Sequence, residues 1–230
     1  MALPVLNDTP KYELEIPSTG RPIKFRPYLV KEEKVLMMAA ETQDGTQMMN
    51  AILDTIKACV QGDCKVEELT TFDLEYLFIK LRSKSVGETS NIMLACKSCE
   101  AQNEHTINLE EIECVGSGSE KFIELDDKVT VEMKYPGYKD LDINANDDEM
   151  GFNVLANSIK AVLVGDERIE IEDETPENVR AFLESMTKDQ FERVGEFLLK
   201  MPQVKHDVVY DCVKCGETNK TELRGIQSFF

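Results

Sequence analysis

Four cysteines stand in two pairs that have the spacing of metal ligands. Cys96 and Cys99 lie in LACKSCEAQN, and Cys212 and Cys215 lie in YDCVKCGETN. A structural zinc ion takes four soft ligands in a tetrahedron, and a spacing of two residues lets one tight turn direct two thiolates at the same ion. Gly216, directly after the second pair, suits a backbone position with positive φ. The pattern predicts one closed, structural Zn²⁺ site of the zinc-ribbon type.

The segments around the two pairs resemble each other beyond the cysteines. In each, a strand pattern leads into the pair, an asparagine follows (Asn103 and Asn219, at the same offset from the first cysteine), and a threonine-bearing strand pattern leads out. We interpret the two segments as versions of one zinc knuckle. Because a single ion would join a hairpin in the middle of the chain to one more than a hundred residues further on, metal binding would be part of folding.

Other uses of these thiols are weaker alternatives. A thioredoxin-like redox motif needs a helix after its Cys-X-X-Cys pair, whereas both pairs here lie between strand patterns. Unrelated thiols, or sites completed by a second chain, stay open. His105 and His206 could replace a ligand, but four cysteines already satisfy the ion, so we expect both histidines to be strand residues. The other cysteines, which we expect to be buried thiols, are Cys59, Cys64 and Cys114.

The composition limits the partners that the chain could have. Of the 230 residues, 42% are apolar, which is enough for a hydrophobic core without disulfides. The chain carries 44 acidic and 26 basic residues, a net charge of -18, and such a surface repels the phosphates of nucleic acids. The segments around the cysteines are not basic either. We therefore expect no nucleic-acid partner.

Catalysis and membrane insertion are not expected. The chain has two histidines, no tryptophan and no glycine-rich phosphate loop. A closed thiolate site also leaves no coordination position for a substrate or for water. There is no apolar leader and no apolar run of about 18 residues. We expect a non-enzymatic protein made in a cytosol, with no membrane contact and no small-molecule substrate.

Hydrophobic periodicity predicts the elements that must position the cysteines. Alternation over residues 12–26 is typical of a β-hairpin with one solvated face. Apolar residues at a spacing of three and four predict helices over 31–42, 46–60 and 69–85. The period then becomes two, which predicts a β-rich region over 90–141.

Helices are predicted again in the segment that separates the two cysteine pairs. One helix is expected over residues 146–165, with Ile159, Val162 and Leu163 in its buried stripe. Two more helices follow in close order. Their start signals are Thr175 with Pro176, and a capping box of Thr187 with Gln190.

These elements predict an α+β fold. It consists of an N-terminal β-hairpin with helices, a zinc-ribbon-like β subdomain built from the two knuckles, and a helical excursion between the knuckles. The expected divisions are residues 1–89 for the hairpin and its helices, 90–145 with 204–226 for the β subdomain, and 146–203 for the helical insertion.

Two stretches resemble a known family. They are IPSTGRPIKFRPYLVKEEKVLMMA, which begins at Ile16, and TTFDLEYLFIKLRSKSVGE, which begins at Thr70. Both are similar to the baseplate hub subunits and hub-assembly proteins of T-even-type contractile-tailed bacteriophages. The resemblance is strongest over about the first 90 residues and compatible through the cysteine knuckles. It carries no catalytic residues.

The resemblance implies a structural or assembly role in the baseplate hub of a phage tail. The implied partners are other hub, tape-measure or tail proteins, and the implied location is the virion tail after assembly in the host cytoplasm. The alternative that the zinc knuckles favour is an adaptor in a nucleic-acid or transcription complex. A zinc enzyme is a third and weaker hypothesis, because the predicted site is closed.

Three segments are candidates for contacts with such partners. They are the hairpin tip with its arginines, the methionine pairs and the terminal aromatic residues. Methionines at helical spacing are usually core residues, and the terminal aromatic rings could instead fold back onto their own domain. The residues are Arg21, Arg26, Met37, Met38, Met48, Met49, Phe229 and Phe230.

Overall fold

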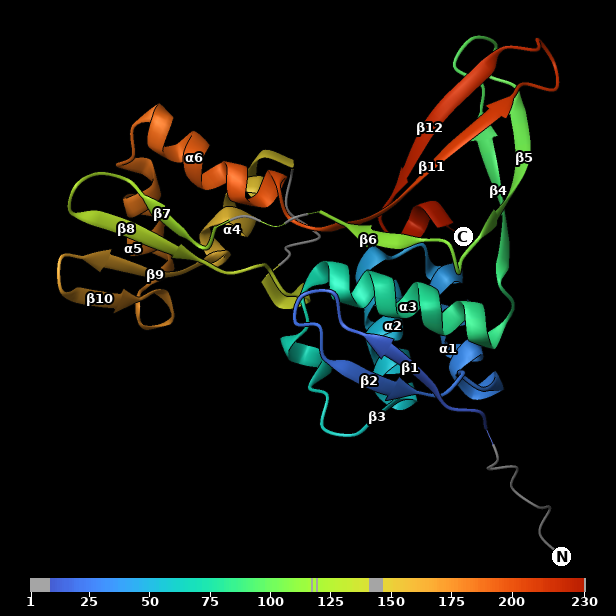
Figure 1. Cartoon of the computed structure of the whole chain (residues 1–230), viewed down its shortest axis with the longest axis horizontal. Helices are drawn as coiled ribbons and strands as arrows, with labels where there is room; N and C mark the ends of the chain where they lie inside the picture. Colours follow the sequence, from blue (N-terminus) through green and yellow to red (C-terminus); the bar gives the residue numbers. More distant parts are fainter. Residues whose placement is uncertain (1–8, 117, 119, 141–146, 230) are drawn as a thin grey trace, which may run out of the picture. The chain divides into compact units, whose positions relative to one another are not determined.

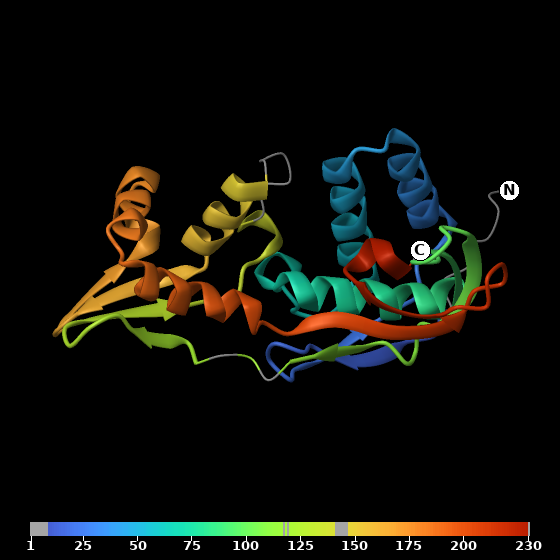
Figure 2. The same ribbon diagram turned by 90° about the horizontal axis from the view of Figure 1, so that it is seen from above.

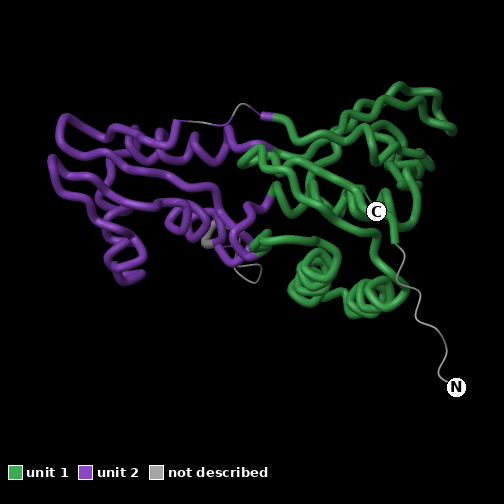
Figure 3. The backbone as a smooth tube through the Cα atoms, turned by 60° about the horizontal axis from the view of Figure 1, so that its bottom comes forward, with its two compact units in different colours: residues 1–66, 72–115, 203–230 green, residues 67–71, 116–202 purple. Residues whose placement is uncertain are grey.

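The chain folds into two compact units (Figure 3). The computed structural model describes residues 9–116, 118, 120–140 and 147–229. Unit 1 comprises residues 1–66, 72–115 and 203–230, and unit 2 comprises residues 67–71 and 116–202. Both units combine helices with antiparallel strands, so the predicted mixture of helices and sheets is confirmed.

The first part of unit 1 is a small sheet with helices (Figure 1). Its elements are β1 (Tyr12–Glu15), β2 (Pro22–Phe25), α1 (Val30–Thr42), α2 (Gly45–Cys59), β3 (Val60–Gln61) and α3 (Thr71–Ser85). β1 and β2 form the predicted hairpin, and β3 pairs with β2. Asp44 begins α2 by accepting hydrogen bonds from the backbone N–H groups of Thr46 and Gln47.

Two β-hairpins complete unit 1 and carry the cysteine pairs at their turns. Their elements are β4 (Thr89–Ala95), β5 (Gln102–Asn108), β6 (Glu113–Val115), β11 (Gln203–Asp211), β12 (Thr218–Arg224) and the short 3₁₀ helix η4 (Ile226–Phe229). β4 pairs with β5, and β11 lies between β12 and β6. Alternate strand residues, among them Ile92, Leu94 and Val208, are buried in one core with Ile79 of α3.

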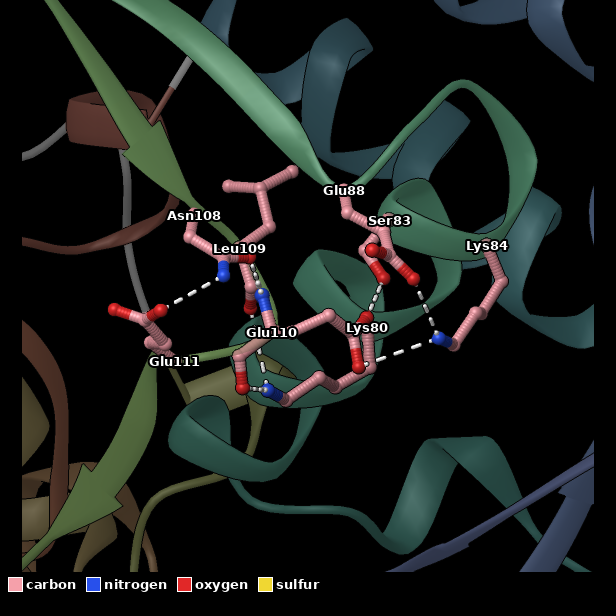
Figure 4. A network of polar contacts seen from close by, with 8 residues as sticks. All are labelled: Lys80, Ser83, Lys84, Glu88, Asn108, Leu109, Glu110 and Glu111. Carbon is pink, nitrogen blue, oxygen red and sulfur yellow. Dashed lines mark hydrogen bonds and ion pairs between the residues drawn. The ribbon is translucent and has the colours of Figure 1, made fainter.

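A network of polar contacts holds α3 against the segment that follows β5 (Figure 4). The Nζ atom of the buried Lys80 donates to the backbone carbonyls of Leu109 (3.2 Å) and Glu110 (2.7 Å). Lys84 forms ion pairs of 3.3 Å with both Glu88 and Glu110. Burial removes water from the ammonium group of Lys80 and thereby lowers its pKa. The two carbonyls accept the hydrogen bonds that this water would otherwise accept.

Unit 2 is an antiparallel sheet covered by helices. Its elements are β7 (Phe122–Glu124), β8 (Val129–Met133), α4 (Asp147–Asn157), β9 (Ile159–Val164), β10 (Glu167–Glu170), α5 (Pro176–Glu184) and α6 (Lys188–Leu199). The strand order is β10-β9-β8-β7, and Figure 2 shows the helices on the same side of the sheet. The predicted caps are confirmed, since Thr175 begins α5 and Thr187 forms a capping box with Gln190 in α6.

The predicted helix over residues 146–165 is wrong in its second half. α4 ends at Asn157, and Ile159, Val162 and Leu163 belong to β9, which pairs with β8 on one side and β10 on the other. A short apolar run rich in β-branched residues fits a helix and a buried strand equally well, and only the available strand partners decide between them. The segment between the knuckles is therefore helical only in part.

The pairing of β7 and β8 also differs from the expectation. The sequence grouped residues 122–133 with the cysteine hairpins, whereas in the structure β7 pairs with β8, and β8 pairs with β9 of unit 2. A period of two identifies a strand but does not identify its partner. Among the described residues, no helix is both long and apolar enough to cross a membrane.

Candidate metal centre

The turns of the β4–β5 and β11–β12 hairpins lie side by side (Figure 1), and the four cysteines of the two pairs meet there. Their Sγ atoms all lie within 4.8 Å of one another. The distance between Cys96 and Cys215 is 3.7 Å, and that between Cys99 and Cys212 is 3.6 Å. Disulfide sulfurs lie about 2.05 Å apart, and a tetrahedron with Zn–S bonds of about 2.3 Å has edges of about 3.8 Å. The sulfur positions therefore fit a metal bound by four thiolates.

The two turns have the same backbone construction. In each, the N–H of the first cysteine donates to a carbonyl beyond the second cysteine, and the residue four places on donates back to the carbonyl of the first cysteine. A left-handed residue closes each turn, Glu100 with φ 59° and Gly216 with φ 74°. Gly216 therefore confirms the predicted positive φ, while the first turn uses a non-glycine residue. The bonds, each of 2.9 Å, are Cys96 to Ala101, Glu100 to Cys96, Cys212 to Glu217 and Gly216 to Cys212.

Two buried asparagines join the turns to each other. Asn219 of the second hairpin accepts a hydrogen bond of 2.9 Å from the N–H of Lys97 in the first turn. Asn103 of the first hairpin accepts one of 2.8 Å from the N–H of Val213 in the second turn. Each amide nitrogen also donates to a carbonyl of its own turn. The common spacing of these asparagines was visible in the sequence, but the exchange across the two hairpins was not.

The site lowers the pKa of two cysteines, Cys96 and Cys212, and raises the pKa of Cys215. The backbone N–H groups of Cys215 and Lys214 lower the pKa of Cys212 to about 6. At Cys215 the N–H of Glu217 acts in the same direction, but the neighbouring thiol of Cys99 and burial raise the pKa to about 12. Opposite shifts are expected for acids that share one site, because the first charge opposes the second. A divalent cation would remove this opposition and favour four thiolates.

The other candidate ligands do not join the cluster. His105 lies in β5, where its ring is 6.3 Å from that of Tyr210, and His206 lies in β11 opposite Leu223. Both are strand residues, as predicted. Cys59 is buried as predicted, whereas Cys64 and Cys114 are only half-buried. Burial raises the pKa of both the Cys59 and the Cys114 thiols to about 11.

The residues predicted to contact partners differ in how exposed they are. Arg21 is exposed at the hairpin tip, whereas Arg26 donates to the carbonyls of Pro27 and Ala58 and pairs with Glu32 at 2.9 Å. Arg26 is therefore committed to its own unit. Met37 and Met38 are 61% and 60% exposed on α1, although helical spacing suggested core positions for them.

The terminal aromatic residue that the structure describes is a core residue. Phe229 has no exposed surface and belongs to the same core as Ile92 and Val208. Its ring leaves no surface for a partner, so the expectation of an exposed anchor is corrected for this residue. The left-handed Gly225 (φ 68°) turns the chain after β12 and directs η4 back onto unit 1. Phe230 lies outside the described residues.

Comparison with known proteins identifies one family. Residues 9–230 match the family model described as T4 bacteriophage base plate protein. Comparisons with curated proteins and with solved structures give no match. The matched range covers the described parts of both units, including both cysteine turns, and agrees with the resemblance of the stretches that begin at Ile16 and Thr70. The chain therefore belongs to the family of T4 bacteriophage base plate proteins.

Proposed function

We propose that the protein is a non-enzymatic structural or assembly component of the baseplate hub and holds one structural Zn²⁺. The family match over residues 9–230 is the observation that carries the baseplate role. The protein acts through contacts with other hub, tape-measure or tail proteins. Its place is the virion tail, after assembly in the host cytoplasm.

The zinc part of the proposal is supported by the chemistry of the donor set. Cys96, Cys99, Cys212 and Cys215 would hold the ion, and four thiolates at tetrahedral spacing are typical of structural zinc. When bound, the ion supplies a cross-link and leaves no open position for substrate. Iron also accepts four thiolates, so elemental analysis has to decide between the two metals.

The residues around the sulfurs support a structural role for the site. Asn103 and Asn219 already hold the two turns in register through backbone N–H groups, and both side chains are buried. An ion at this place would link residues far apart in the chain, so that its binding free energy would count as folding free energy of unit 1. Such a cross-link suits a protein that must present fixed surfaces to neighbours in a large assembly.

The alternative role as an adaptor on nucleic acid receives less support. A net charge of -18 opposes contact with phosphates. A gel shift at low salt is the most permissive test, and we expect no complex with single-stranded or duplex DNA at micromolar protein. A complex that weakens steeply with salt would favour the adaptor instead.

The hub assignment is tested in phage particles and in assembly intermediates. Chemical cross-linking followed by mass spectrometry should join this protein to hub, tape-measure or tail-tube neighbours. If the protein acts only during assembly, these cross-links appear in intermediates and are missing from finished particles. Cross-links confined to peripheral baseplate proteins would contradict the hub role while leaving the family membership intact.

A further inference from the structure

Unit 2 has an open apolar groove between α4 and α6, called here the α4–α6 groove. Phe152 and Leu155 line it on α4, and Phe191 and Leu199 line it on α6. Its volume is about 710 Å³. Leu199 is 79% exposed and Phe191 is 37% exposed, so large apolar side chains face solvent along the groove. Apolar grooves between helices are places where proteins bind other molecules.

Two glycines lie inside the helices that form the walls of this groove. Gly151 lies in α4 and Gly195 in α6, and both line the groove. Glycine within a helix is less stable than alanine. Apart from the two chain neighbours and the backbone of the same helix, a β-carbon placed on either glycine would meet no atom within 4 Å. Packing within the described chain therefore does not require these glycines, and their effect is to leave the groove open.

The charge around the groove indicates the class of molecule that it fits. Glu192 and Glu196 line the groove, and no basic side chain of the described residues does. Glu192 forms an exposed pair with Lys188 of α6, and Glu196 forms one with Lys200, directly after α6; exposed pairs of this type contribute little to stability. Of the chain's 44 acidic and 26 basic residues, 23 acidic and 10 basic lie in unit 2, which gives this unit a net charge of -13.

The negative charge of unit 2 opposes most classes of molecule that could bind in the α4–α6 groove. Nucleic acids and anionic membranes carry phosphates that the acidic unit repels. A second copy of the chain would bring two units of net charge -13 together. A protein segment that is both apolar and basic meets no such opposition, and an apolar groove between two helices suits the apolar face of a third helix.

We propose that the α4–α6 groove binds an amphipathic helix of a partner protein, with leucine-like side chains on one face and lysine or arginine beside that face. The inference rests on the proposed role in protein contacts and adds the chemistry of one partner. Gly151 and Gly195 admit the apolar side chains of the helix, and Glu192 and Glu196 pair with its basic residues.

The test uses the whole protein and a synthetic peptide. The peptide has about 18 residues, with leucines at helical spacing, lysines at the other positions and one tryptophan on the leucine face. Because the protein contains no tryptophan, all tryptophan emission comes from the peptide. We expect saturable binding with a blue shift of the emission. A second peptide with glutamate in place of lysine should bind at least about tenfold more weakly.

Matched variants separate the groove from the general acidic surface. Gly195→Leu fills the groove without changing the charge and should weaken binding about tenfold or more. Ala181→Leu adds the same side chain at an exposed position of α5 outside the groove and should bind like the wild type. Leu199→Gln changes a side chain that is largely exposed, so it tests the groove even if Gly195→Leu fails to fold.

Three results would overturn the proposal. The first is equal binding of the lysine and glutamate peptides. The second is unchanged affinity in both Leu199→Gln and a folded Gly195→Leu. The third is self-association of the wild type that Gly195→Leu abolishes, since this would assign the groove to a second copy. None of these results depends on zinc or on cross-links in phage particles, so the proposed function is tested separately.

Discussion

The carboxyl group of Glu75 should make the stability of unit 1 depend on pH. Glu75 lies in α3, and burial raises its pKa to about 7, although the backbone N–H of Ile226 donates to it and acts in the opposite direction. Ile226 begins η4, which ends at the buried Phe229. The carboxyl group therefore lies where α3 meets the C-terminal segment.

The sign follows from the two pKa values. The ordinary pKa of the group is 4.5 and its folded value is about 7, so the folded chain holds the proton more tightly than the unfolded chain. The contribution of Glu75 to stability is complete below pH 4.5 and is lost as the pH rises through about 7. One pKa unit corresponds to about 1.4 kcal/mol, so the loss between about pH 5.5 and 8.5 is about 2 kcal/mol.

Glu75→Gln removes this dependence, because the amide oxygen can still accept from Ile226 and carries no charge. Urea unfolding across this pH range should show the variant gaining about 2 kcal/mol relative to the wild type as the pH rises. Glu104→Gln, at an exposed position of β5, is the matched control and should follow the wild type. A constant difference between Glu75→Gln and the wild type at every pH would refute the reasoning.

Two further predictions concern the core and the turns. Phe229→Ala removes a ring with no exposed surface and should lower the free energy of unfolding by about 3–5 kcal/mol. The control Phe122→Ala changes a side chain that is 54% exposed and should lower it by less than about 1 kcal/mol. Equal effects of the two variants in calorimetry would show that η4 does not pack in the core. Asn219→Ala leaves the N–H of Lys97 without its hydrogen-bond acceptor. In competition with a chelator, this variant should hold the metal about 10–100-fold more weakly than the wild type. Unchanged metal affinity would limit Asn219 to a packing role.

The two cysteine turns were predictable because the information for each turn is local. Two Cys-X-X-Cys pairs with a matching asparagine indicate two similar turns, and the positive φ of Gly216 follows from its residue type. The helix starts at Thr175 and Thr187 were predictable for the same reason, since a cap depends on residues within one turn. In these places the physical cause lies within a few residues of its effect.

The features that escaped prediction depend on distant partners. Ile159–Val164 becomes a strand because β8 and β10 lie on either side of it, and nothing within the segment shows this. Phe229 looks like a free terminal ring until the turn at Gly225 directs it into the core formed by the strands of unit 1. The α4–α6 groove requires two helices to meet, so its glycines carry no signal when each helix is read alone.

The metal content of the protein tests the central claim most directly. Protein purified without added metal should contain about one zinc per chain by elemental analysis. Cys212→Ser should lose most of this zinc, while Cys64→Ser, which lies outside the four-sulfur cluster, should keep it. Less than about a tenth of a zinc per wild-type chain, or the same zinc content in Cys212→Ser as in the wild type, would contradict the account.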